Sequence, residues 1–268
     1  MQGQAQAQLV SSKESQAVVQ HMVNIAISEV LFRRGIIPEN AFASAKFGKE
    51  KVKKLRAKDQ LGDERKGDMD ESAQRKFDAI TSWLQGHVKE AIVKQYAEEI
   101  ILEICVPPAS QEEAGEGRAK DWEEQGTSEG GPQVIERYTF LLDYDTGIPK
   151  LQAGGYQGVK VRESKEDIKE TAEKVLREFI GLLSAGTSST KLPPDYWLSV
   201  RIVYTENTPI DFTEGNDFTT EVSPENGDDD GDSMKNLTLG PLKTPHHSLA
   251  LNLKWREDDD DRPEPESL

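Results

Sequence analysis

A segment near the N-terminus has both the start and the stop signals of a helix, and it constrains the fold more than any other part of the chain. Ser11–Glu14 has the pattern of a capping box, in which a hydroxyl and a later carboxylate satisfy the first backbone amides. Gly35 and Pro38 supply the stop, because glycine reaches the left-handed conformation and proline cannot continue a helix. Between them, apolar residues recur at spacings of three and four, which predicts a helix with one buried face: Val19, Met22, Val23, Ala26, Ile27, Val30 and Leu31.

Two later segments have the same helical spacing, and four others have the character of strands. The second predicted helix runs from about Asp70 to Gln95, and the third begins at another capping box, Ser164–Asp167. The predicted strands are 97–106, 134–144, 197–205 and 249–255, in which apolar residues form short runs or alternate with polar ones. Helices and strands that follow one another in this way indicate an α+β fold, with helices layered on a sheet.

Several segments are too polar or acidic to build a core. We expect residues 1–10 to be a disordered N-terminus, 107–132 a disordered acidic loop and 257–268 an acidic tail, around a domain that covers 11–256. The segment 206–232 has ten acidic side chains and no lysine or arginine. Since such a segment buries little apolar surface, it can separate from the rest of the domain at low cost.

Charge disfavours nucleic acid as a general partner but leaves one local exception. The net charge of the 268 residues is −16, so the protein as a whole repels a phosphate backbone. The run Lys46–Lys58 nevertheless holds seven basic residues and one acid, and the candidate nucleic-acid contacts within it are Lys51, Lys53, Lys54 and Arg56. The alternative is a solvated loop around three apolar anchors, and the overall charge favours that interpretation.

A search for catalytic or metal-binding patterns finds none. The single cysteine, Cys105, lies in an apolar run that is typical of a buried strand, which fits a reducing compartment. The four histidines, including the adjacent pair His246 and His247, have no second ligand at metal-binding spacing. Phosphate-loop, dinucleotide and nucleophile-elbow motifs are absent, and no apolar run reaches the roughly 18 residues of a membrane span. We therefore expect a protein that is not an enzyme and has no cofactor.

Four phrases, taken in order, resemble the HORMA-domain family, in particular the meiotic HORMA-domain proteins of the chromosome axis. The first is Ile27–Phe42, which includes Arg33-Arg34-Gly35-Ile36-Ile37-Pro38-Glu39, and the last is Tyr204–Phe212, which includes Thr208-Pro209-Ile210-Asp211-Phe212. Val52–Leu55 with Asp59, and then Tyr138–Phe140, lie between them in the family's order. The chain departs from the meiotic pattern after Phe212, where Thr213–Phe218 replaces the usual prolines.

The resemblance implies three helices packed on a mostly antiparallel sheet, with a detachable C-terminal "safety belt" at 206–256. It implies capture of a short closure-motif peptide, which adds to a sheet edge as a strand before the belt closes over it. The residues that match the peptide-binding edge are Trp197, Leu198, Val200, Ile202 and Tyr204, although core packing is at least an equal alternative for Val200 and Ile202. The residues that match the belt are Thr208, Pro209, Asp211 and Phe212, followed by the docking strand with Leu249, Leu251, Leu253 and Trp255.

The same resemblance implies a nuclear, chromosome-associated adaptor that supports axis assembly and the control of recombination and synapsis. Its partners would be closure motifs of axis-core or cohesin-associated proteins, a closure motif of its own kind for self-association, and a AAA+ remodelling ATPase. Two alternatives stay open. One is a HORMA adaptor of the spindle-checkpoint, translesion-polymerase or autophagy branch, and the other is a DNA-binding protein that uses Lys46–Lys58.

Overall fold

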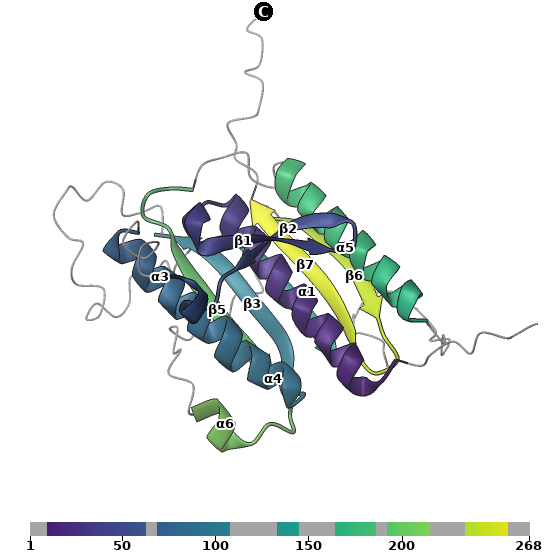
Figure 1. Cartoon of the computed structure of the whole chain (residues 1–268). Coiled ribbons are helices and arrows are strands. Elements are labelled where there is room, and N and C mark those ends of the chain that lie inside the picture. The colour runs from purple at the N-terminus through teal and green to yellow at the C-terminus, as the bar shows by residue number, and fades with distance from the viewer. Residues whose placement is uncertain are drawn as a thin grey trace, which may run out of the picture.

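A five-stranded antiparallel sheet with helices on one face forms the body of the protein (Figure 1). The computed structural model describes residues 10–62, 69–107, 133–144, 164–185, 192–214 and 234–256. The helices are α1 (Ser12–Arg33), α3 (Glu71–Ser82), α4 (Lys89–Val93), α5 (Lys165–Ala185) and α6 (Ile210–Glu214). The strands are β1 (Phe42–Phe47), β2 (Glu50–Leu55), β3 (Ala97–Val106), β4 (Gln133–Asp143), β5 (Trp197–Tyr204), β6 (Met234–Lys243) and β7 (Ser248–Arg256). This α+β architecture confirms the predicted fold class.

The order of the strands in the main sheet is β5-β3-β4-β7-β6, and every pairing is antiparallel. Apolar side chains continue across all five strands on the face that packs against the helices. One such row crosses the sheet from Ile202 through Ile100, Phe140 and Leu251 to Leu239. Because side chains of partnered residues lie on the same face, this row joins both edges of the sheet to one core.

The second half of helix α1 is buried on nearly all sides, so the prediction of a single buried face was too narrow there. Every residue from Met22 to Leu31 except Asn24 is buried. One side of α1 packs on the sheet, and the β1–β2 hairpin covers the side that would otherwise face solvent (Figure 1). The segment Lys46–Lys58 is therefore mostly a hairpin rather than the favoured solvated loop, because Val52 and Leu55 are buried beneath it.

The second predicted helix contains an irregular turn. It begins at Asp70, whose carboxylate accepts a hydrogen bond from the Ala73 amide at 2.7 Å. A π-helical turn at Trp83–Val88 then separates α3 from α4, and both Trp83 and Val88 are buried. The apolar period of the sequence continues through this turn, so the periodicity alone predicted one uninterrupted helix.

Strand β6 and the short helix α6 are absent from the sequence-based expectation. β6 contains Gly240 and Pro241, where its pairing with β7 shifts register between Leu239 and Leu242. Proline and glycine disrupt the alternation that identifies a strand, yet both are tolerated on a strand that lies at the edge of a sheet. The sequence therefore recovered only β7 of this terminal hairpin.

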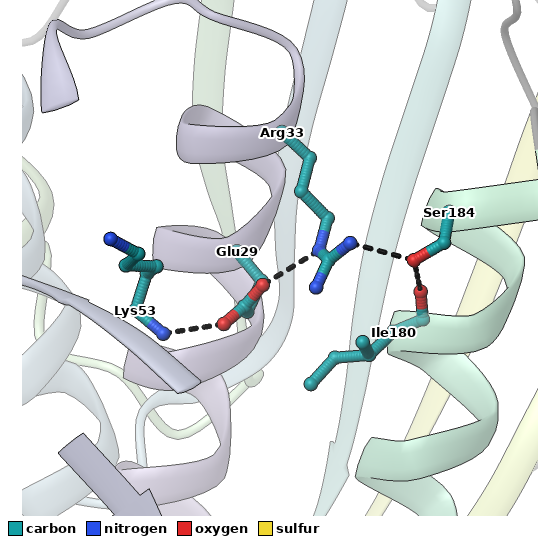
Figure 2. Close-up of polar contacts among 5 residues, drawn as sticks. All are labelled: Glu29, Arg33, Lys53, Ile180 and Ser184. Carbon is teal, nitrogen blue, oxygen red and sulfur yellow. Dashed lines mark hydrogen bonds and ion pairs between the residues drawn. The ribbon is translucent and has the colours of Figure 1, made fainter. Parts of the chain in front are cut away.

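Buried Glu29 joins three separate elements through its two carboxylate oxygens, as Figure 2 shows. One oxygen accepts a hydrogen bond from the Lys53 backbone amide of β2 at 2.5 Å, and the other accepts from Arg33 Nε at 2.7 Å. Arg33 also donates to the Ser184 hydroxyl of α5 at 2.6 Å. Glu29 is 1% exposed, so this carboxylate depends on these donors in place of water.

The end of α1 is also attached to the sheet. Arg34 forms an ion pair with buried Glu136 of β4 at 2.7 Å, and the Tyr138 hydroxyl donates to the same carboxylate at 2.7 Å. Gly35 follows with a φ of +64°, which lets the chain leave the helix in the left-handed region. The two arginines of the phrase Arg33-Arg34-Gly35 therefore connect α1 to α5 and to β4 respectively.

Glu29→Ala should destabilise the protein, because it removes a buried carboxylate and leaves the Lys53 amide and the partly exposed Arg33 guanidinium without their acceptor. We expect a loss of about 2–3 kcal/mol in the free energy of unfolding, measured by urea denaturation. Glu39→Ala is the matched control, since Glu39 pairs with Lys53 Nζ at 2.8 Å but is 74% exposed and should cost about 1 kcal/mol or less. Equal losses for the two variants would contradict the role assigned to Glu29.

Candidate functional site

Strand β5 lies at one edge of the sheet and pairs, within the described part of the chain, with β3 alone. Leu198, Val200, Ile202 and Tyr204 alternate along it and contact the core, and Val200 is 5% exposed. The structure thus bears out core packing for Val200. The predicted edge residues do belong to one strand, but Trp197 is partnered with Cys105 and lies on the opposite face from the other four.

A charge cluster that the sequence analysis missed stabilises the other face of β5. Glu103 of β3 is 1% exposed and accepts hydrogen bonds from Arg137 Nε at 2.6 Å and from the Ser199 hydroxyl at 3.1 Å. Arg201 of β5 lies 3.6 Å from the same carboxylate. The register places Ser199 opposite Glu103. In the sequence, the polar residues Ser199 and Arg201 at alternate positions of β5 were the only sign that this face carries polar contacts. This cluster connects the edge strand to β3 and β4.

The chain leaves β5 through a compact corner. The Thr205 amide donates to the Tyr96 carbonyl at 2.7 Å, and the Thr208 amide donates to the Thr205 carbonyl at 3.0 Å. Pro209 then begins the single turn of α6, in which the Phe212 amide donates to the Pro209 carbonyl at 3.0 Å. These bonds fix the direction in which the chain departs from the edge.

The ring of Phe212 packs the corner against the turn that joins α4 to β3 and against the end of β5. It contacts Tyr96 and Tyr204 edge-to-face, with centroids 5.0 Å and 5.7 Å apart, and Lys94 Nζ lies 4.8 Å from its centroid. Asp211 is exposed in the first turn of α6. The structure therefore brings Thr208, Pro209 and Phe212 together directly after β5, as the matched phrase predicted in sequence.

The other predicted belt residues lie at the opposite side of the sheet. β7 pairs with β4, and Leu249, Leu251 and Leu253 are all buried. Trp255 is half-buried opposite Glu136, and β6 covers the outer edge of β7. The predicted belt therefore begins beside β5 and ends in a hairpin three strands away, while residues 215–233 lie outside the described residues.

Buried His247 connects the β6–β7 turn to the first turn of α1. Its Nδ1 lies 2.8 Å from the Ser15 hydroxyl, and Ser15 is also hydrogen-bonded to the Thr244 hydroxyl. Thr244 in turn accepts from the His247 amide at 3.0 Å, and the Tyr144 ring packs edge-on against the imidazole at 5.6 Å. In the sequence, His246 and His247 stand out only as potential metal ligands, and this structural role of His247 depends on a contact with distant Ser15. The described residues contain no group of three metal-binding side chains.

The basic residues of Lys46–Lys58 lie apart from this edge, on the hairpin over α1 (Figure 1). Lys51 and Lys54 are exposed, whereas Lys53 Nζ pairs with Glu39 and lies 4.6 Å above the Phe32 ring. Arg56 Nε donates to the Phe42 carbonyl at 3.2 Å. Lys53 and Arg56 thus have structural contacts that compete with a role in ligand binding.

Stability should fall at acid pH through His247. Burial and the neighbouring His246 lower the pKa of His247, so the docked hairpin favours the neutral ring. The stabilisation is complete above the pKa of an unfolded histidine, near 6.5, and is lost as the pH falls below it. Urea denaturation between pH 7.5 and 5.5 should show a smaller loss in His247→Asn than in the wild type.

The control for that experiment is His246→Asn, which changes an exposed ring and removes only the smaller cause of the lowered His247 pKa, so it should keep most of the pH dependence of the wild type. His21, whose pKa is lowered by burial and by Lys54, contributes in the same direction in all three proteins. An identical pH dependence in His247→Asn and the wild type would contradict the assignment to His247.

Comparison with known proteins agrees with this geometry. The model of the HORMA domain matches residues 15–247. HORMA domain-containing protein 1 of Danio rerio is 24% identical over 91% of the chain, and meiosis-specific protein HOP1 of Saccharomyces cerevisiae is 23% identical over 91%. The chain spans 57% and 39% of the lengths of these two relatives.

Solved structures share the fold at lower identity. HTP-1 of C. elegans bound to the HIM-3 closure motif matches with a TM-score of 0.60 and 16% identity, over 92% of both chains. C. elegans HTP-2 bound to the same motif matches with a TM-score of 0.58 and 16% identity, again over 92% of both chains. A chain of the mitotic checkpoint complex matches with a TM-score of 0.54 and 14% identity, over 91% of this chain and 99% of that one. The family match over residues 15–247, together with the shared fold, shows that the chain belongs to the HORMA-domain family.

Proposed function

We propose that this protein is a meiotic chromosome-axis adaptor that captures closure-motif peptides at β5 and retains them with its belt. One observation carries the proposal: β5 stands at one edge of the sheet, while the last two strands of the belt occupy the other edge. A belt that begins beside the receiving strand and is anchored on the far side can cross over whatever binds between. The role is binding, and no step of it requires a catalytic group.

The edge strand suits strand addition because its side chains are already fixed. An added strand gains affinity from backbone hydrogen bonds and selectivity from alternate side chains. On the helix-facing side of β5, Val200 is buried in the core, so its side chain would offer little contact to a bound peptide. On the other face, Arg201 and Val203 are each 38% exposed and would lie beside the peptide. The Glu103 cluster holds Arg201 in place for this contact.

The length of the belt is sufficient for such a crossing. Residues 215–233 join α6 to β6, and an extended chain covers roughly 3.3 Å per residue, or roughly 60 Å in total. The five strands of the sheet span roughly 20 Å at the usual strand spacing. The segment can therefore pass around a bound peptide and still reach the opposite edge.

The similarity to meiotic relatives over 91% of the chain supports the meiotic branch over the spindle-checkpoint, translesion-polymerase and autophagy branches. The structures of HTP-1 and HTP-2 contain closure motifs, which supports peptide capture as the activity. By the same argument we propose axis-core or cohesin-associated proteins as partners, self-association through a closure motif, a AAA+ ATPase as the remodelling factor, and a nuclear, chromosome-associated location. Axis assembly and the control of recombination and synapsis would follow from these contacts.

Peptide binding should change the protease sensitivity of the belt. Limited proteolysis should cut the free protein within 206–247, because the acidic segment there buries little apolar surface. A saturating closure-motif peptide from a candidate axis protein should suppress this cutting, and a scrambled peptide should not. The same cutting rate with and without the matched peptide would contradict belt closure.

Phe212→Ala should shorten the lifetime of the complex by loosening the start of the belt. The ring makes two edge-to-face contacts, so its removal should cost about 1.4 kcal/mol and speed peptide dissociation about tenfold. Fluorescence polarisation of a labelled peptide, followed after dilution, measures this rate. Ile210→Ala is the control, because Ile210 belongs to the same turn but is 70% exposed. A similar acceleration in both variants would count against a specific anchor at Phe212.

A further inference from the structure

The β1–β2 hairpin concentrates positive charge on a protein that is strongly acidic elsewhere. Lys46, Lys51 and Lys54 are all exposed on it, although the chain carries a net charge of −16. Within the described part of the chain, none of these three ammonium groups lies within ion-pair distance of a carboxylate. We call these three lysines the hairpin patch.

The carboxylates nearest to the hairpin patch accept hydrogen bonds or ion pairs from other residues. Glu50, which adjoins Lys51 in sequence, accepts a hydrogen bond from Arg177 of α5 at 2.6 Å. Glu39 pairs with Lys53. Glu29 lies beneath the hairpin and is occupied by Arg33 and the Lys53 amide. Glu173 of α5, at the tip of the hairpin, accepts from the Lys49 backbone amide at 3.3 Å. None of these acids forms an ion pair with a lysine of the hairpin patch.

The register of the hairpin increases this excess. Lys46 is the direct cross-strand partner of Lys51, so two like charges face each other on the solvent side. Such a pair is destabilising in the free protein, and it becomes favourable when an anion lies between or over the two groups. Lys54 lies three residues after Lys51, and these two are the exposed positions of β2, whose burial repeats every three residues. The charge of Lys54 also lowers the pKa of His21, although burial of the ring is the larger cause.

The hairpin that carries the patch is held in a fixed position by contacts with α1 and α5. Beneath it, the Lys53 and Leu55 amides donate to Glu29 and to the Ser28 hydroxyl of α1, at 2.5 Å and 3.0 Å. At its tip, Gly48 has a φ of +58°, and a Cβ there would lie 1.7 Å from a carboxylate oxygen of Glu173. A ribbon fixed at both ends presents its lysines in a constant arrangement, so little conformational entropy of the backbone is lost when a ligand binds.

We propose that the hairpin patch binds the phosphate backbone of duplex DNA without reading its sequence. Lysine suits a phosphate as a point charge, whereas base recognition favours bidentate arginine, and the only arginine of the hairpin segment is bonded to the Phe42 carbonyl. Single-stranded binding needs exposed aromatic rings, but Phe47 packs against the core and on His21. The patch lies over α1, away from β5, so the assignment does not depend on peptide capture.

The experiment measures binding of the 268-residue protein to a labelled mixed-sequence 30-base-pair duplex by fluorescence anisotropy. With three phosphate contacts, affinity should fall about 40-fold between 50 and 200 mM salt. The variant Lys46→Glu/Lys51→Glu/Lys54→Glu should weaken binding at 50 mM salt by at least about tenfold. Circular dichroism melts of each protein confirm that the variants are folded.

The matched control is Lys13→Glu/Lys89→Glu/Lys235→Glu, which makes the same change in net charge on three other exposed sites. It should stay within about twofold of the wild type, because long-range repulsion alone is largely screened. Absence of duplex binding by the wild type, or an equal loss in the control, would overturn the proposal. Binding to a polyglutamate peptide but not to the duplex would also overturn it, and would point to an acidic protein partner.

Discussion

The carboxylate of Glu29 is the interaction on which the arrangement of the helices depends. It is buried near the C-terminal end of α1, and it accepts hydrogen bonds from a strand of the hairpin and from Arg33, which reaches α5 (Figure 2). A buried charge of this kind is stabilising only when its donors are all in place, so hairpin, α1 and α5 must assemble together. The ion pair of Arg34 with Glu136 then sets this helical unit on the sheet.

This central unit leaves the two edges of the sheet with different roles. At one edge, β5 is hydrogen-bonded to Glu103 of β3 through Ser199, on the face away from the helices. It ends in the corner formed by Thr208, Pro209 and Phe212. At the other edge, β7 and β6 complete the sheet, and His247 connects their turn to α1. The same α1 thus supports both the scaffold and the terminal hairpin, which would give the proposed belt a fixed end.

Local patterns in the sequence predicted the three long helical segments and four of the strands, because capping residues and apolar periods act over a few positions. The HORMA resemblance added the functional phrases, and the family match confirms it. What the sequence did not show depends on distant contacts. Burial on nearly all sides of α1 requires the hairpin, and the role of His247 requires Ser15, more than 200 residues away. Gly240 and Pro241 interrupt the strand pattern of β6, so the sequence did not predict it, although an edge strand tolerates both residues. The edge residues Trp197, Leu198, Ile202 and Tyr204 stay predictions as peptide contacts.

The central claim is that a peptide adds to β5 as a strand. Hydrogen–deuterium exchange, recorded with and without a saturating closure-motif peptide, tests it most directly. The account predicts slower exchange of amides in Trp197–Tyr204 on binding, with little change in the central strand β4. Protection by the peptide at another surface, with exchange in β5 unchanged, would contradict the account.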